Sequence, residues 1–158
     1  MRDAATTHKQ ILNVGDKSIR VTIPAGVADG QRLKLRGHGG EAPQGGTRGD
    51  LYITFRIAPD PTFVRQGDDL YTDLPLPLTT AVLGGEVTLT TLMAETLRLK
   101  VNAGTQPSGK LRLKGKGFPR YKKEGERGDL IVIFNIVIPT ILTDEQRELF
   151  LRLQQLSL

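Results

Sequence analysis

The sequence predicts an all-β protein: two tandem β-sandwich-like domains of related sequence, followed by a short C-terminal helix. The first observation behind this is an internal repeat. Residues 19–39 and 97–117 align without a gap and share seven identical residues, and residues 48–57 and 127–136 both begin Arg-Gly-Asp-Leu. The spacing between the copies grows from 78 to 79 residues, which indicates one inserted loop residue. A repeat of this period predicts two copies of one small β-unit.

The second observation is the alternation of apolar and charged residues with period two, which is typical of strands with one buried and one solvated face. The expected strands are 9–14, 19–23, 33–35, 52–57, 70–74, 86–90, 96–101, 111–113 and 130–138. Two of them, 52–57 and 130–138, are apolar enough that we expect both faces to be covered.

The domain boundary is expected near Thr62–Gln66, just after the break at Pro59-Asp60-Pro61. The first unit has one strand before its copy of the repeat and the second has several, so the first is shorter on its N-terminal side. The predicted division is 1–64 for the first β-domain, which is shorter at its N-terminus, 65–142 for the second β-domain and 143–158 for the C-terminal helix.

The third observation is that helical patterns are few. A short helix is expected at 78–83, ended by Gly84-Gly85. In the C-terminal segment Thr143 and Gln146 form a capping box, and a helix follows. Its apolar stripe is formed by Leu149, Phe150, Leu153 and Leu156. Such a stripe packs either on its own domain or on another subunit, and the pattern does not decide between them.

Composition restricts the functional classes. The chain has no cysteine, a net charge of +5 and a pI near 9.7. It has no run of 18 apolar residues and no secretory signal pattern, so we expect a cytoplasmic protein that does not enter membranes. The positive charge suits nucleic acid, an anionic surface or an acidic partner segment.

No catalytic or metal-binding constellation is predicted. The glycines near residues 37 and 115 lack the Lys-Ser/Thr that a phosphate-binding loop requires, and turns that need positive φ explain them better. The two Arg-Gly-Asp triplets are interpreted as turns in which the Asp bonds the local backbone. His8 lies near a terminus expected to be loosely held, and His38 has a lysine as its repeat partner. We therefore expect no enzyme activity, no cofactor and no metal.

Several of these segments resemble the C-terminal region of DnaJ-type co-chaperones. The resemblance lies in the order of motifs and covers residues 15–155 approximately. The matching segments are 23–40 (Ile-Pro-Ala-Gly-Val to His-Gly-Gly), 48–53, 60–71 (with Asp-Pro-Thr-Phe), 74–85, 111–119 and 127–132. The J domain and the Cys-rich zinc region of such proteins are absent from this sequence, as are the opening strands of the first peptide-binding domain.

The resemblance implies a chaperone that binds non-native client polypeptides through a shallow apolar groove and acts with a DnaK-type chaperone, including its acidic C-terminal tail. It implies a homodimer formed through the C-terminal helix, at Leu149, Phe150, Leu153 and Leu156. It also places Ile19 in an apolar wall, Lys17 at the rim and Phe63 as a pocket aromatic, with Val21 a further candidate. Without the resemblance, ordinary core packing explains Ile19 and Val21, and a plug between the two domains explains Phe63.

The alternative hypothesis is a small basic nucleic-acid-binding module. It would use Lys110, Arg112, Lys114, Lys116 and Lys122. Aromatic stacking platforms are scarce, since Tyr121 alone sits in a basic cluster, so nucleic acid is the less favoured partner.

Overall fold

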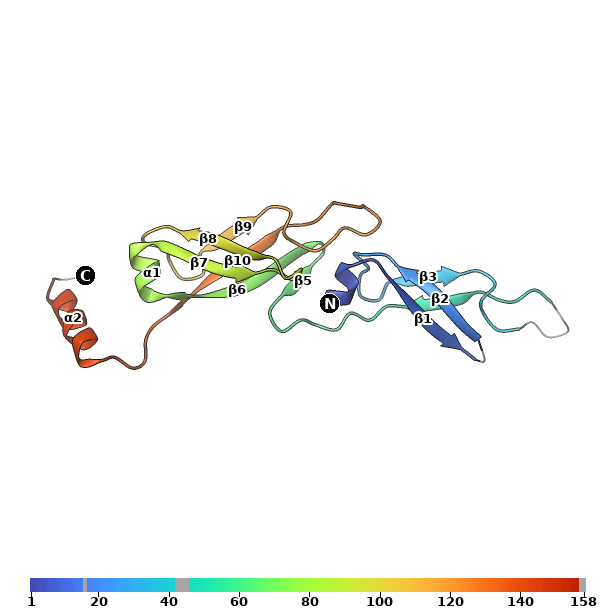
Figure 1. The fold of residues 1–158 in the computed structure, drawn as a ribbon, viewed down its shortest axis with the longest axis horizontal. Helices are drawn as coiled ribbons and strands as arrows, with labels where there is room; N and C mark the ends of the chain where they lie inside the picture. The colour runs from blue at the N-terminus through green and yellow to red at the C-terminus, as the bar shows by residue number, and fades with distance from the viewer. Residues whose placement is uncertain (16, 42–45, 157–158) are drawn as a thin grey trace.

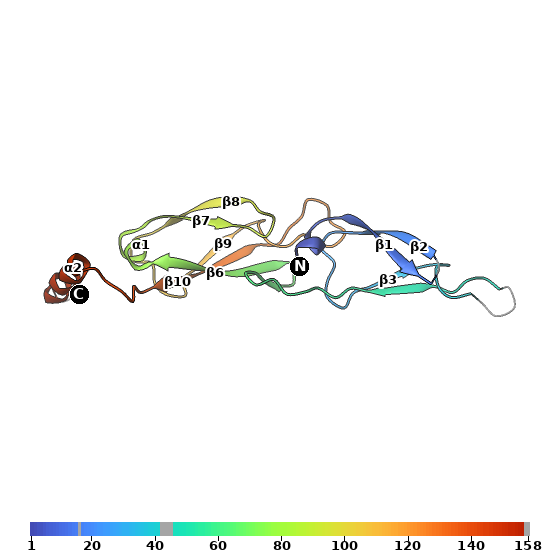
Figure 2. The same cartoon turned by 60° about the horizontal axis from the view of Figure 1, so that its bottom comes forward.

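The two β-units lie end to end, and the C-terminal helix stands beyond the second (Figures 1 and 2). This computed structural model describes residues 1–15, 17–41 and 46–156. Strands dominate and the short helix is C-terminal, so the predicted all-β class is confirmed. No helix in the described part of the chain has both the length and the apolar character needed to cross a membrane.

The first unit consists of two antiparallel pairs. The hairpin pairs β1 (His8–Val14) with β2 (Lys17–Ile23), and the second pair joins β3 (Arg32–Leu35) to β4 (Leu51–Thr54). The expectation of a loose N-terminus is wrong for the described residues. A 3-10 helix at Arg2–Ala5 packs against the body, with Ala4 and Ala5 buried.

The elements of the second unit are β5 (Val64–Gln66), β6 (Asp69–Pro77), α1 (Leu78–Leu83), β7 (Gly85–Thr90), β8 (Thr96–Val101), β9 (Lys110–Leu113) and β10 (Leu130–Val137). They form a larger sheet in the order β5-β6-β10-β9 and a separate hairpin of β7 and β8. β6 runs parallel to β10, whereas β9 and β5 are antiparallel to their neighbours. In the repeat, β7 to β10 therefore correspond to β1 to β4, while β5, β6 and α1 have no counterpart among the described residues of the first unit.

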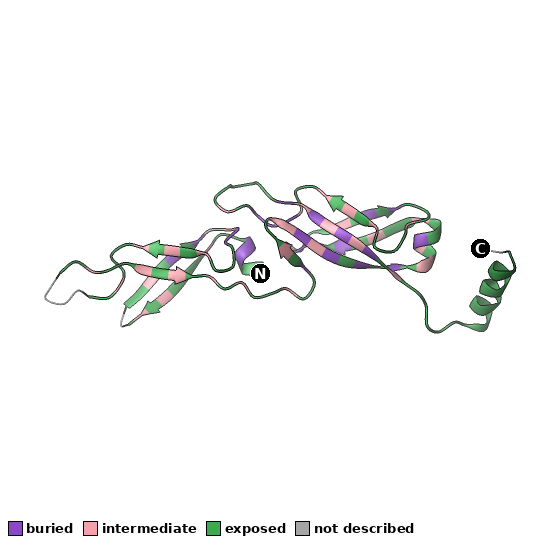
Figure 3. Cartoon of the chain, turned by 180° about the vertical axis from the view of Figure 1, so that it is seen from behind, coloured by how far each residue is buried: buried purple, intermediate pink, exposed green. Residues whose placement is uncertain are grey.

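The most deeply buried side chains lie mainly in the second unit and at its border with the first. Figure 3 shows most of the buried residues (purple) there. The largest fully buried ones are Phe63, Phe118, Leu70, Leu76, Leu130, Val27 and Val132. The inward residues of β6 and β10 form the centre of this core, because each strand turns alternate residues to the hairpin of β7 and β8.

The expectation that 52–57 and 130–138 are covered on both faces is wrong. Along β4 the residues alternate between half-buried and exposed, and the strand ends at Thr54. In β10 one face is buried and the other is half-buried or exposed. The two strands also differ in their neighbours. β10 lies between β6 and β9, whereas in the described part of the chain β4 pairs with β3 alone.

The interpretation of Gly37 and Gly115 as turn residues with positive φ is confirmed, but the Arg-Gly-Asp triplets are not turns themselves: each Asp instead accepts from the turn 13 or 14 residues earlier in the chain. Gly37 and Gly115 have φ of 70° and 68°, and their N–H groups donate to Asp50 Oδ1 (3.1 Å) and Asp129 Oδ1 (2.9 Å). Gly117 meets the backbone of the same triplet so closely that a Cβ there would lie 2.5 Å from Asp129 O.

The terminal helix α2 (Asp144–Gln155) begins with the expected capping box. Thr143 Oγ1 accepts from the Gln146 N–H at 3.2 Å, and Gln146 Oε1 accepts from the Thr143 N–H at 2.9 Å. None of its described residues is buried, and Figure 1 shows it separated from the β-unit by an extended linker.

Candidate functional site

A shallow depression lies at the far end of the first hairpin, where two of the predicted site residues meet. Lys17 and Ile19 occupy one strand two residues apart, so their side chains share a face. Val14 from β1 and the loop that follows β3 complete the rim, giving a volume of about 410 Å³. The loop residues that line it are His38, Gly39, Gly40, Glu41 and Arg48.

The depression combines an apolar floor with a charged border. Ile19 is half-buried and faces Leu12 across the hairpin, so it offers an apolar contact without being sealed in the core. Lys17 is exposed at the edge, while Arg48 forms an ion pair with Glu41. Such a surface can receive an apolar side chain and attract an acidic one beside it.

The structure does not bring the other two predicted residues to this surface. Val21 lies on the same face of β2 as Ile19 but is buried, with 4% of its surface exposed. Phe63 is 2% exposed and lines a different depression of about 580 Å³, between the two units, together with Met1, Ile57 and Tyr121. Its position agrees with the alternative in which Phe63 is a plug between domains.

The border between the units contains a cluster that sequence reasoning missed. Arg65 Nη1 donates to Val27 O at 2.7 Å and Nη2 donates to Gly26 O at 3.1 Å, both in the first unit, while Nε donates to Gly67 O at 2.7 Å. Burial lowers the pKa of this guanidinium, and Asp68 opposes the shift. The repeat did not point to this cluster. Gly26 and Gly104 are equivalent in sequence, yet a Cβ on Gly26 would meet the backbone of Pro119 to Tyr121 in the second unit, whereas one on Gly104 would meet nothing within 4 Å.

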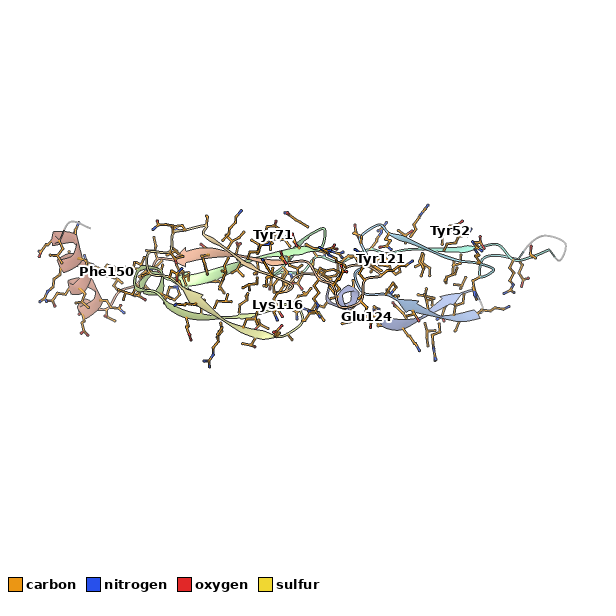
Figure 4. All side chains as sticks on the ribbon, turned by 90° about the horizontal axis from the view of Figure 1, so that it is seen from above. Tyr52, Tyr71, Lys116, Tyr121, Glu124 and Phe150 are labelled. Carbon is orange, nitrogen blue, oxygen red and sulfur yellow. The ribbon has the colours of Figure 1, made fainter. Side chains whose placement is uncertain are left out.

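The predicted dimerisation residues lie on an exposed apolar surface. Leu149, Phe150 and Leu153 of α2 line a depression of about 640 Å³ together with the end of β6, the start of α1 and the linker. Leu156 is 75% exposed at the end of the helix. Ile141 in the linker, which sequence reasoning did not select, lines the same depression and is 88% exposed. Figure 4 labels Phe150 on the isolated helix.

The residues of the nucleic-acid hypothesis are partly engaged with carboxylates. Arg112 pairs with Asp129, and Lys116 Nζ lies 2.7 Å from Glu95 Oε1. Lys122 Nζ lies 5.3 Å from the centre of the Tyr121 ring. Two of the five basic residues are thus neutralised locally, which reduces the positive field that nucleic acid would require.

Two carboxyl groups that bond to the glycine turns have lowered pKa values. A side-chain hydrogen bond from Lys34 and a backbone bond from Gly37 lower the pKa of Asp50. The backbone bond from Gly115 and the contact with Arg112 lower the pKa of Asp129 in the same way. Across 1–15, 17–41 and 46–156, no three His, Cys, Asp or Glu residues are grouped so as to hold a metal ion.

Fold and surface together define a tandem β-domain protein that presents strand edges, a small apolar and cationic depression and an exposed apolar helix. The sequence model of the family described as "DnaJ C terminal domain" matches residues 2–139. The chain belongs to this family, and the resemblance drawn from the motifs is confirmed.

Proteins named "Chaperone protein DnaJ" are its relatives. That of Caldicellulosiruptor bescii is 43% identical over 141 residues, covering 89% of this chain and 36% of the relative. That of Parageobacillus thermoglucosidasius is 46% identical over 141 residues, covering 89% and 37%. That of Bartonella quintana is 43% identical over 142 residues, covering 90% and 37%. The chain therefore spans little more than a third of the length of these relatives.

Proposed function

We propose that this chain is a chaperone segment that binds non-native polypeptides at the β2 end of its first unit and has no catalytic activity. The proposal rests on membership of the DnaJ C-terminal family together with the depression at Lys17 and Ile19. We also propose the division into 1–64, 65–142 and 143–158, and a cytoplasmic setting in which the chain acts with a DnaK-type chaperone.

Binding would combine backbone pairing with one apolar contact. In the described chain β2 pairs with β1 alone, so its other edge is open to an extended segment. Backbone pairing is indifferent to sequence, which permits many clients. A client side chain that covers Ile19 would contribute about 1.5–3 kcal/mol, so each site would bind weakly.

Lys17 would extend the same site to acidic partners. It is exposed beside the apolar floor, so it would favour segments in which a large apolar residue is flanked by Asp or Glu. The acidic C-terminal tail of a DnaK-type chaperone has this chemistry. Because an exposed charge pair is screened by salt, that preference should weaken as ionic strength rises.

A homodimer through α2 would supply avidity to these weak sites. An isolated helix of this length is marginal in water, so its exposed apolar stripe favours a packing partner. Two linked sites raise the apparent affinity for a client that reaches both. Leu149, Phe150, Leu153 and Leu156 are the residues that we propose for this interface.

The test is a fluorescence titration with an apolar peptide, an acidic-flanked apolar peptide and a reduced, carboxymethylated unfolded protein. Ile19→Ser should weaken all three several-fold, whereas Leu97→Ser, at the equivalent position of β8, should not. Lys17→Glu should weaken chiefly the acidic-flanked peptide at low salt, and Lys9→Glu on the neighbouring strand is its charge-matched control. Unchanged binding in folded Ile19→Ser would refute the site.

Phe63→Ser would not be a clean probe of this groove. Because Phe63 is buried between the units, we expect its loss to lower stability rather than to remove a contact with the client. A steep fall of affinity with log salt for a DNA duplex, exceeding any response of the peptides, would instead favour the nucleic-acid hypothesis.

A further inference from the structure

The larger sheet of the second unit has an apolar outer face, on the side away from the β7–β8 hairpin. A sheet that packs one face on the core commonly presents polar residues on the other. Here the outward positions of the two central strands include Tyr71 of β6 and Ile131 and Ile133 of β10, all half-buried. Val64 of β5 lies beside Tyr71 and is 59% exposed. Figure 4 labels Tyr71 on this side of the unit.

The repeat shows that the fold does not require apolar residues at these positions. Ile133 corresponds to Thr54 of the first unit through the Arg-Gly-Asp-Leu blocks, so a polar residue is accepted at the equivalent place. Val64, Tyr71 and Ile133 together line a depression of about 490 Å³. A contiguous apolar surface that the fold does not need indicates an interaction site.

Charges of opposite sign border this surface on its two sides. The strand register places Asp73 of β6, Ile133 of β10 and Lys110 of β9 in one row across the sheet. Asp73 and Lys110 are exposed, and in the part of the chain that the structure describes neither forms an ion pair. The neighbouring row ends at Arg112, which pairs with Asp129. The outer face is therefore an apolar strip with an acidic border on β6 and a basic border on β9.

The shape of this strip fits a helix better than an extended strand. β10 pairs with β6 on one side and with β9 on the other, so its outer face offers side chains but no free backbone edge. The two borders lie two strand spacings apart, about 9–10 Å, and a helix with its side chains is about 10–12 Å wide. An amphipathic helix presents one apolar stripe with polar side chains along both of its borders, which matches the strip.

We propose that this outer face of the β5-β6-β10-β9 sheet binds an amphipathic helix of a partner protein. The helix lies along β10, and its apolar stripe covers Ile131 and Ile133. Its basic border lies over Asp73, and its acidic border lies over Lys110 and Arg112. The surface is separate from the depression at the end of the first hairpin, so the inference does not depend on client binding there.

The probes are three fluorescent helical peptides with the same leucine stripe, used with the whole chain. The mixed peptide has Lys along one border of the stripe and Glu along the other, the second peptide has Lys along both, and the third has Glu along both. The parent should bind the mixed peptide most tightly. Asp73→Lys should transfer that preference to the Glu peptide, and Lys110→Glu should move it toward the Lys peptide. Glu86→Lys, on the exposed face of the β7–β8 hairpin, makes the same change of charge as Asp73→Lys and should leave the preference unchanged.

Two further measurements test the apolar strip and its location. Ile133→Thr introduces the residue of the equivalent position in the first unit and keeps a good strand former, so it should fold and bind all three peptides several-fold more weakly. Ile19→Ser should bind the mixed peptide as the parent does. Hydroxyl-radical footprinting of the parent needs no variant, and there the mixed peptide should protect Tyr71 and leave Tyr52 reactive.

Equal affinity of the parent for the three peptides, or no protection of Tyr71, would overturn the proposal. An unfolded polypeptide without a helical pattern that protects Tyr71 equally well would make the face a client surface instead. A dimer that Ile133→Thr dissociates would make it an interface between two copies of this chain. Either result would likewise overturn the assignment of a partner helix.

Discussion

The guanidinium of Arg65 lies over the ring of Phe118, with Cζ 3.7 Å from the ring centre. The same group donates to the carbonyl oxygens of Gly26 and Val27 in the first unit. One side chain thus joins a buried aromatic of the second β-unit to a turn of the first. Because these bonds and this ring contact span the two units, Arg65 is expected to set their relative orientation.

Removal of this side chain should loosen the joint. Arg65→Ala loses the charge-assisted bonds and the cation–π contact, which together stabilise the protein by about 2–4 kcal/mol. Arg65→Lys keeps the charge but lacks the planar guanidinium with its several N–H donors, so it should retain only part of this stabilisation. Urea unfolding measures the loss, and small-angle X-ray scattering measures the change of orientation. Parent-like curves from both methods for Arg65→Ala would contradict the assigned role.

The repeat supplies a matched pair of glycines for testing the contact between the units. Gly26 and Gly104 have φ of 87° and 77°, so alanine is strained at both positions. A Cβ on Gly26 would also lie 2.5 Å from the backbone N of Tyr121, while one on Gly104 would meet nothing within 4 Å. We expect Gly104→Ala to cost about 1 kcal/mol and Gly26→Ala about 3 kcal/mol or more. Thermal unfolding of the two variants measures both losses of stability. Equal losses would rule out a tight contact between Gly26 and the second unit.

The turn at Asp129 predicts a pH dependence of stability. Its pKa is lowered in the folded protein from the ordinary 3.8, so its contribution is present above that pH and is lost as pH falls through the folded value. Asp129→Asn can still accept from Gly115 but loses the charge facing Arg112. It should melt below the parent at pH 7, and the gap should narrow below about pH 4. A gap that stays constant from pH 7 to pH 2 would contradict this account.

The apolar face of α2 predicts the oligomeric state. In sedimentation at micromolar concentration we expect a dimer for the parent and a monomer for Leu149→Asp with Leu153→Asp, because each carboxylate would be buried against apolar side chains. Leu151→Asp with Gln155→Asp adds the same charge at the same spacing on the opposite face, so it should remain a dimer. A parent chain that sediments as a monomer would refute the proposed interface.

Local chemistry made much of the fold predictable. Strands with period two and the capping box at Thr143 rest on residues close in sequence, so their pattern contains the physical cause. Lys17 and Ile19 could be placed together for the same reason, as residues two apart on one strand share a face. The repeat predicted that the two units are related and that the first is shorter.

Tertiary structure alone decided how distant segments meet. Phe63 is separated from Ile19 because it follows the bend at Pro61 and Thr62 and lies at the border between the units, which alternation within strands cannot report. Among the described residues β10 is a central strand and β4 is an edge strand, although their sequences correspond, because lateral pairing depends on which other segments lie beside a strand. The sequence by itself determined the two β-units and the amphipathic helix, since these follow from short-range periodicity. Long-range packing decided which faces are buried, which strands pair with each other and how Arg65 joins the units, because burial is a property of the assembled chain.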